Sequence, residues 1–173
     1  MTFDLFEEMD KFLAGSSIAA PGADPEFVLL MGGVCAGKTT MRKQKFSRGY
    51  AVLDAGEIFL NLSRGHYYNF GAAFEEQLDL IGYGIAFRAI QQRRHLVTEM
   101  TGGQLPVERY EGLIEAMLSV GYKAELLYVH CDFESAQQRN LNRGDDNISA
   151  YYTEPYHVRW LLDAVREIRE SVE

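Results

Sequence analysis

The sequence predicts an α/β fold: a three-layer α/β/α sandwich around a short parallel sheet of about four to five strands. Apolar segments of strand length at 27–31, 50–53, 95–99 and 124–131 alternate with longer stretches of helical periodicity, which is the order of βαβ units. The first segment, FVLLM, is apolar throughout, as is typical of a central strand covered on both faces. Because ligands of such folds bind at the carboxyl ends of the strands, the residues after each strand are the first candidates for a site.

A glycine-rich segment follows the first strand and fits the P-loop pattern G-x-x-x-x-G-K-[ST] from Gly32 to Thr39. A chance glycine-rich turn would match it too, but here a strand precedes the match and the helix-like TTMRKQKF follows it. Backbone N–H groups of such a loop form an anion nest, a lysine at Lys38 reaches the phosphates and the Thr39 hydroxyl binds Mg²⁺. The sequence therefore predicts ATP and Mg²⁺ as cofactors, held by Gly33, Val34, Cys35, Ala36, Gly37, Lys38, Thr39 and Thr40.

The whole chain of 173 residues has the composition of one globular domain, with 47% apolar and 24% charged residues. Its net charge of −8 lacks the basic footprint of a nucleic-acid binder, so a small anionic substrate is favoured. No apolar run approaches the roughly 20 residues that span a membrane, and the acidic start is unlike a targeting peptide. With only two cysteines, Cys35 and Cys131, we expect no structural disulfide and a cytoplasmic location.

Along the single domain, 1–173, an amphipathic helix is expected within 1–15, a loop at 16–25 and the nucleotide-binding core at 26–173. The N-terminal helix either packs on the core or presents a face to a partner. Within the core, further helices are predicted at 57–62, over most of 66–95, and at 107–120, 133–143 and 156–172. The polar stretch 143–155 has the composition of a lid.

Three carboxylates stand at or near the carboxyl ends of predicted strands, on the same edge of the sheet as the P-loop. Asp54 and Glu57 follow the second strand and Glu99 ends the third. Phosphoryl transfer to a hydroxyl needs a carboxylate to accept the acceptor's proton, and Asp54 is the first candidate, with a further role as a metal ligand. Asp54 also suits a turn at a strand end, and Glu57 an exposed helix start.

Two arginines, Arg139 and Arg143, stand four residues apart on one face of a predicted helix, beside the lid-like stretch. From there they are able to clamp the transferring phosphoryl group as an arginine finger does. Solvated charges on a surface helix are the alternative.

These segments together resemble zeta-toxin-type P-loop kinases over most of the chain. The resemblance is carried by FVLLMGGVCAGKTT, AVLDAGEIF, HLVTEMTGG, SVGYKAELLYVHCDFESAQQRNLNR and YYTEPYHVRWLL. It implies an ATP- and Mg²⁺-dependent kinase that phosphorylates a hydroxyl of UDP-N-acetylglucosamine or a related sugar nucleotide, with an antitoxin as partner. By position, Glu57, Glu99 and Thr101 would contact the acceptor, and Arg139 or Arg143 would serve as the lid arginine.

The chain departs from this family at two motifs. The family's strand-two motif reads D-x-D, whereas here Asp54 is followed by Ala55 and Gly56, so either Asp54 or Glu57 acts as the base or the base is missing. The second lid arginine of the family falls near Tyr152, and the family's final strand has no counterpart. Two other functions therefore stay open: a nucleotide-gated binding protein with weak or no transfer, and a 5′-hydroxyl polynucleotide kinase.

Overall fold

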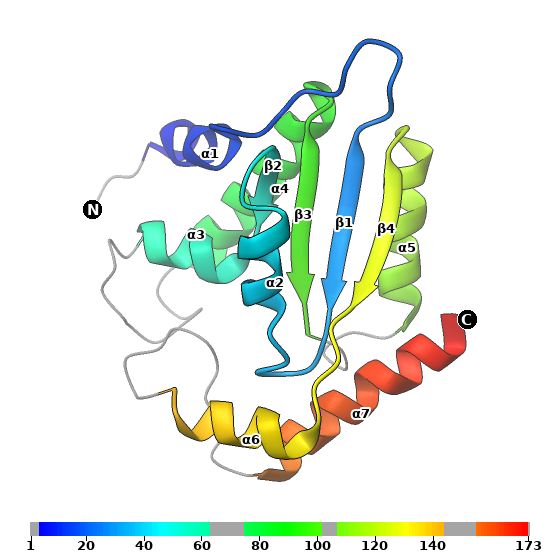
Figure 1. The fold of residues 1–173 in the computed structure, drawn as a ribbon. Helices are drawn as coiled ribbons and strands as arrows, with labels where there is room; N and C mark the ends of the chain where they lie inside the picture. Colours follow the sequence, from blue (N-terminus) through cyan, green and yellow to red (C-terminus); the bar gives the residue numbers. More distant parts are fainter. Residues whose placement is uncertain (1–3, 63–74, 102–106, 144–154, 173) are drawn as a thin grey trace.

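A four-stranded parallel sheet with the order β2-β3-β1-β4 forms the centre of the molecule, in a computed structural model that describes residues 4–62, 75–101, 107–143 and 155–172 (Figure 1). The strands are β1 (Glu26–Met31), β2 (Tyr50–Leu53), β3 (His95–Met100) and β4 (Lys123–Tyr128). β1 is central because its apolar run is buried on both faces, as the sequence indicated. The predicted α/β fold with a short parallel sheet is confirmed.

Strand register aligns the ends that carry the candidate site. Leu30 of β1 lies opposite Glu99 of β3, and Met31 lies opposite Met100 of β3 and Tyr128 of β4. On the far side of β3, Leu53 at the end of β2 pairs with Thr98. The segments that follow β1, β2 and β3 therefore leave the sheet at one edge, as parallel strands require.

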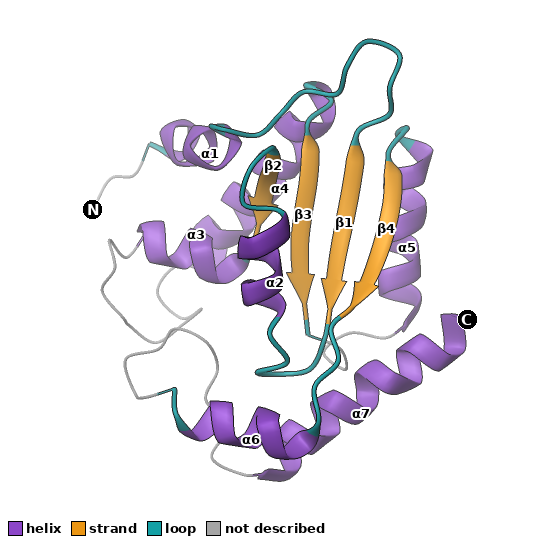
Figure 2. Ribbon diagram, viewed as in Figure 1, coloured by secondary structure: helices purple, strands orange, loops and turns teal. Residues whose placement is uncertain are grey.

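Helices cover both faces of the sheet, which gives the predicted three layers (Figure 2). The described helices are α1 (Leu5–Leu13), α2 (Lys38–Lys45), α3 (Ala55–Leu62), α4 (Glu75–Gln91), α5 (Val107–Ser119), α6 (Phe133–Leu141) and α7 (Pro155–Val172). Among these, no helix combines the length and the apolar character needed to cross a membrane.

Two apolar cores flank the sheet because alternate side chains of β1 point to opposite faces. Phe27, Leu29 and Met31 pack with residues of α1, α3, α4 and α5 and with the end of α7. Val28 and Leu30 pack with the P-loop, α6 and the first half of α7. The long helix α7 thus contributes to both cores, and it lies across the carboxyl end of the sheet in Figure 1.

The N-terminal helix α1 packs on the core through α4. Asp4 caps its first turn, and Met9 and Leu13 are buried. A Cβ added to Gly84 of α4 would lie 2.3 Å from Cε of Met9, so the helices approach closely because this residue is glycine. Of the two alternatives for this helix, packing on the core is the one observed.

Element boundaries differ from the prediction mainly after β4. Its ladder ends at Tyr128, whereas the sequence predicted a strand to Cys131. The backbone N–H of Val129 still donates to the carbonyl of Met31 at 2.7 Å, but the chain then turns, and Asp132 caps α6. The helix expected over 66–95 is described for 75–91, and α6 ends at Leu141 rather than Arg143. In the lid-like stretch, residues 144–154, which include Tyr152, lie outside the described residues.

Candidate functional site

The loop Gly32–Thr39 joins the end of β1 to α2, and glycine is needed at three of its positions. Gly37 has φ +104°, a backbone conformation that side chains with a Cβ rarely adopt. A Cβ on Gly32 would lie 2.7 Å from the Val129 carbonyl oxygen, and one on Gly33 would lie 2.6 Å from Cδ2 of Leu162 in α7. The loop is therefore held between the end of β4 and α7, with the first turn of α2 at its far end.

Lys38, the first residue of α2, folds back over this loop. Its ammonium donates to the carbonyl oxygens of Gly32 at 2.7 Å and of Gly33 at 2.9 Å. Burial lowers the pKa of Lys38 to about 8, with the charge of Arg143 acting in the same direction and that of Glu99 against it. The ammonium group of Lys38 therefore places a positive charge beside the loop, where it is able to donate to phosphate oxygens in place of the two carbonyl oxygens.

The next residue, Thr39, is tied to the end of β3. Its Oγ1 donates to Oε2 of Glu99 at 2.8 Å. The other oxygen of that carboxylate, Oε1, accepts from Nε of Arg42, and the Glu99 side chain is only 6% exposed. Glu99, proposed from the sequence as an acceptor-binding residue, is thus placed against the P-loop helix.

Asp54 and Glu57 lie beside this network at the start of α3. Oδ1 of Asp54 accepts the backbone N–H of Glu57 at 2.8 Å, a capping contact for the first turn of α3. Burial raises the pKa of the Asp54 carboxyl, and the charge of Glu99 adds to the effect. Oε1 of Glu57 accepts from Nη2 of Arg42 at 2.8 Å, and Nζ of Lys43 lies 3.8 Å away.

A cavity of about 610 Å³ opens over the P-loop, and both predicted arginines line it. Arg139 reaches it from α6, where its Nη1 donates to the Cys35 carbonyl oxygen at 3.1 Å and to Sγ of Cys131 at 3.4 Å. Arg143 follows α6 by two residues. The remaining lining comes from the loop, from α2 and from the end of β4: Cys35, Ala36, Gly37, Lys38, Thr39, Thr40, Met41, Gln44, Lys45 and Val129.

Thr101, the other predicted acceptor contact, directly follows β3. Its carbonyl oxygen accepts from the Tyr110 hydroxyl at 3.2 Å, and its side chain is half-buried. The next residues of the predicted motif lie outside the described residues. The structure therefore brings Lys38, Thr39, Asp54, Glu57 and Glu99 into one connected region, with Thr101 at the end of the adjoining strand.

The donors in this region fit a nucleotide with Mg²⁺. The Thr39 hydroxyl gives its hydrogen to Glu99, which leaves its oxygen lone pairs for a cation, and a hydroxyl oxygen is a ligand that suits Mg²⁺. Within the described part of the chain, no cluster of three or more His, Cys, Asp or Glu residues forms a metal cage.

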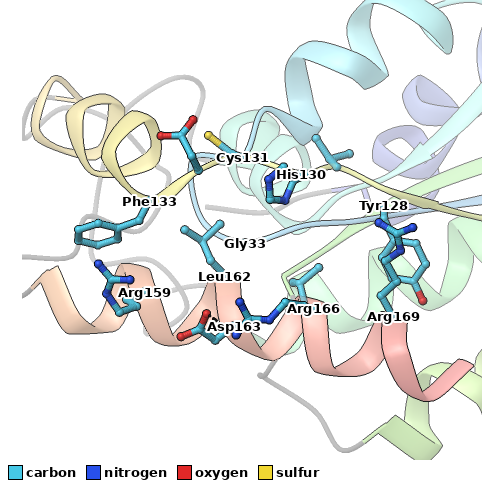
Figure 3. A pocket seen from close by; sticks show the side chains of 13 residues that line it. Gly33, Tyr128, His130, Cys131, Phe133, Arg159, Leu162, Asp163, Arg166 and Arg169 are labelled. Carbon is cyan, nitrogen blue, oxygen red and sulfur yellow. Dashed lines mark ion pairs between the residues drawn. The ribbon is translucent and has the colours of Figure 1, made fainter.

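A second, smaller cavity of about 210 Å³ lies beside Gly33, between the segment after β4 and α7 (Figure 3). Arg159 stacks over the Phe133 ring at 4.0 Å, and Arg166 pairs with Asp163 at 3.0 Å. Val129 lines both cavities. No pattern in the sequence indicated this cavity, because residues from β4 and α7 meet here only through the packing of α7.

One site residue that the sequence reasoning missed is Arg42, which is 5% exposed and contacts both Glu57 and Glu99. Arg42 stands three residues after Thr39, on the same face of the helix. That spacing alone does not identify its partners, because Glu57 and Glu99 come from other elements.

No protein-family model matches the chain, and no curated protein matches its sequence. Solved structures do match. A chain of the AvrRxo1-ORF1:AvrRxo1-ORF2 complex with ATP superposes with a TM-score of 0.68 at 16% identity, over 97% of this chain and 55% of that one. A chain of the Pnkp1/Rnl/Hen1 RNA repair complex gives 0.67 at 11% identity, over 90% and 49%.

A third match is the PezAT chromosomal toxin–antitoxin system of Streptococcus pneumoniae, with a TM-score of 0.61 at 18% identity over 99% of this chain and 75% of that one. The chain spans about half the length of the chains matched in the first two structures. At these identities the likeness shows the fold alone, an α/β fold with a parallel sheet flanked by helices. The structural similarity to zeta-toxin-type proteins that the sequence suggested is confirmed.

Proposed function

We propose that this protein is an ATP- and Mg²⁺-dependent kinase that moves the γ-phosphoryl group to a hydroxyl of a small molecule, with a sugar nucleotide as the first acceptor class to test. One observation carries the proposal: Lys38, Thr39 and two arginines from α6 and its end line one cavity. Burial lowers the pKa of Lys38, and the negative charges of Glu99 and Asp54 act against that effect. Loop, cations and carboxylates are the parts that phosphoryl transfer uses for positioning and charge stabilisation.

Each residue has a distinct role in this proposal. The loop N–H groups and Lys38 hold the phosphate chain, and the Thr39 hydroxyl contributes a ligand for Mg²⁺, which when bound neutralises charge on the phosphates. Arg139 and Arg143 stabilise the transferring group from the opposite wall. Asp54 accepts the acceptor's proton, which its raised pKa favours by making it a stronger base.

Two features favour a second candidate, a nucleotide-gated binding protein with weak or no transfer. Position 56 is glycine, where a second aspartate would stand in the D-x-D motif. Glu57, the other carboxylate available as a base, is engaged by Arg42. Under this alternative Mg-ATP binds tightly and no acceptor is consumed.

Mass spectrometry separates the two candidates. The protein is incubated with Mg-ATP and a pool of sugar nucleotides, nucleosides, amino sugars and a 5′-hydroxyl oligonucleotide, in parallel with Lys38→Ala. A product heavier by one phosphoryl group, absent with the variant, supports the kinase and names its acceptor. ATP bound but unconsumed across the pool favours the binding protein, and phosphorylation of the oligonucleotide alone favours a polynucleotide kinase despite the net charge of −8.

The match to a toxin–antitoxin system also suggests a protein partner for this chain. We extend the proposal to an antitoxin-type inhibitor because one structural match belongs to a toxin–antitoxin system. Loss of kinase activity on adding a protein encoded beside this one, at equal molar amounts, is the expected result. Unchanged activity in a demonstrated complex would contradict it.

A further inference from the structure

Arg42 is a buried cation shared by two carboxylates from different elements. Its Nε donates to Oε1 of Glu99 at the end of β3, and its Nη2 donates to Oε1 of Glu57 in α3 at 2.8 Å. The Arg42 and Glu99 side chains are each 6% exposed, and that of Glu57 is 29% exposed. Charges this far from water are retained when they are paired and hydrogen-bonded, as these are.

The Glu99 contact reaches the predicted metal ligand. Thr39 and Arg42 lie three residues apart on one face of α2, and they bond to different oxygens of the same carboxylate. Both oxygens of the Glu99 carboxylate therefore accept hydrogen bonds from side chains of α2. Because its orientation is fixed by Arg42, the direction in which the Thr39 hydroxyl donates is fixed too, and with it the direction of the lone pairs left for a cation.

The Glu57 contact reaches the predicted base. Glu57 belongs to the first turn of α3, and its backbone N–H is bonded to Oδ1 of Asp54. Through Arg42, the first turn of α3 is held against α2, the helix that follows the P-loop. A planar guanidinium, which donates in two directions at once, suits this bridge better than the point charge of a lysine.

We propose that Arg42 is a positioning residue of the proposed kinase site. It sets the Thr39–Glu99 pair for Mg²⁺ and places the Asp54-bearing turn relative to the P-loop. This proposal rests on the proposed function. It deepens that function by naming Arg42 as the residue that links the Thr39–Glu99 pair, proposed to bind Mg²⁺, to the turn that carries the proposed base Asp54.

Arg42→Lys is the test variant, because it keeps the buried charge and removes the two-directional grip. Lys43→Met is the matched control: Lys43 is the next residue of α2, its side chain is 64% exposed, and it stands 3.8 Å from the same Glu57 oxygen. ATP binding to each purified protein is measured by calorimetry with and without Mg²⁺, together with kcat and KM. Circular dichroism verifies folding.

We expect Arg42→Lys to reduce the affinity gained from Mg²⁺ by about 10- to 100-fold, the usual cost of losing an outer-shell partner. Binding of metal-free ATP should stay near the wild-type value, kcat should fall more than KM rises, and Lys43→Met should behave as wild type. In a Thr39→Ala background, Arg42→Lys should cause no further loss of the Mg²⁺ effect, because it acts through that hydroxyl.

The proposal would be overturned if Mg²⁺ increased the ATP affinity of Arg42→Lys and of Lys43→Met by the same factor. If Arg42→Lys lost as much affinity for metal-free ATP as for Mg-ATP, Arg42 would have a structural role only. If Arg42→Lys does not fold, Glu99→Asp replaces it: the shorter side chain keeps its charge but cannot reach both partners, so the same shift is expected and its absence is decisive. A wild-type protein that binds Mg-ATP without transferring would remove the kinase function, yet the binding comparison would still decide the role of Arg42. No binding of ATP by the wild type would overturn both.

Discussion

Thr39 and Glu99 are separated by 60 residues in the sequence, and their side chains are joined by a hydrogen bond of 2.8 Å. The bond links the first turn of α2 to the end of β3, two elements that parallel pairing of β1 with β3 brings together. A phosphate-binding loop and an acidic strand end thus become parts of one site. The predictions below test what each part of that site does.

Lys38 gives the site a pH dependence. Because its pKa is lowered to about 8, the side chain is charged below that pH and loses its proton as pH rises through it. A bound phosphate stabilises the charged form, so ATP affinity should fall above about pH 8, and binding at pH 9 should take up a proton. Calorimetry in two buffers of different ionisation enthalpy measures that proton. Lys38→Arg, which does not titrate in this range, should show no uptake.

Asp54 can be tested with two variants that separate its two contacts. Asp54→Asn keeps an oxygen for the backbone N–H of Glu57 but cannot act as a base, whereas Asp54→Ala loses both. Both should lower kcat by about 10²- to 10⁴-fold, the range of general-base catalysis. Only Asp54→Ala should also destabilise the fold, by about 1 kcal/mol, as loss of a cap does. Wild-type kcat in Asp54→Asn would remove Asp54 from the mechanism.

The pH profile of the proposed kinase activity tests the role of Asp54 independently of substitutions. Burial raises the pKa of this carboxyl, so the base is protonated and inactive up to a higher pH than an exposed aspartate would be. We expect the acid limb of the kcat profile to lie above the ordinary range of an aspartate. A limb at the ordinary aspartate value would point to an exposed carboxylate instead.

Arg143 is predicted to act on the transition state more than on the bound nucleotide. It lines the cavity over the P-loop, on the α6 side. Arg143→Ala should therefore lower kcat by about 10³-fold or more, the scale of an arginine finger, with a much smaller change in ATP affinity. Arg109→Ala, on the exposed face of α5, is the control and should leave both values unchanged. A loss of ATP affinity with kcat unchanged would show that Arg143 contributes only to ground-state binding.

The substitution Gly33→Ala tests whether α7 packs closely against the P-loop. An added Cβ would lie 2.6 Å from Cδ2 and 3.1 Å from Cα of Leu162, so the helix backbone must move. Gly33→Ala should lower the free energy of unfolding by about 1–3 kcal/mol, measured by urea denaturation. Gly112→Ala in α5 meets nothing within 4 Å and should gain up to about 1 kcal/mol from helix propensity. Equal effects of the two changes would contradict the close contact.

The sequence predicted those features that depend on neighbours along the chain. β1 and the P-loop followed from FVLLM and the glycines after it, and α1 from its apolar spacing. Arg139 and Arg143 were expected on one face of a helix; α6 ends at Leu141, before Arg143, but both residues line one cavity. α4 continues through Gly82, because packing on α1 and α3 stabilises the helix more than one glycine weakens it.

What the sequence could not predict were pairings set by strand order. Arg42 meets Glu99 and Glu57 because β3 lies between β1 and β2, an order that no local pattern encodes. The second cavity likewise depends on how α7 crosses the end of the sheet. The capping role of the Asp54 side chain was foreseen only as a general turn preference.

The central claim is that the γ-phosphoryl group of ATP is transferred to a hydroxyl at this site. The most direct test uses ATP carrying ¹⁸O in its γ-phosphoryl group, with the acceptor pool and Mg²⁺, and follows both ADP and phosphorylated product by mass spectrometry. The account predicts a product that carries the labelled phosphoryl group, in an amount matching the ADP formed, with no such product from Lys38→Ala. Bound ATP with no labelled acceptor, or label found only in inorganic phosphate, would contradict it.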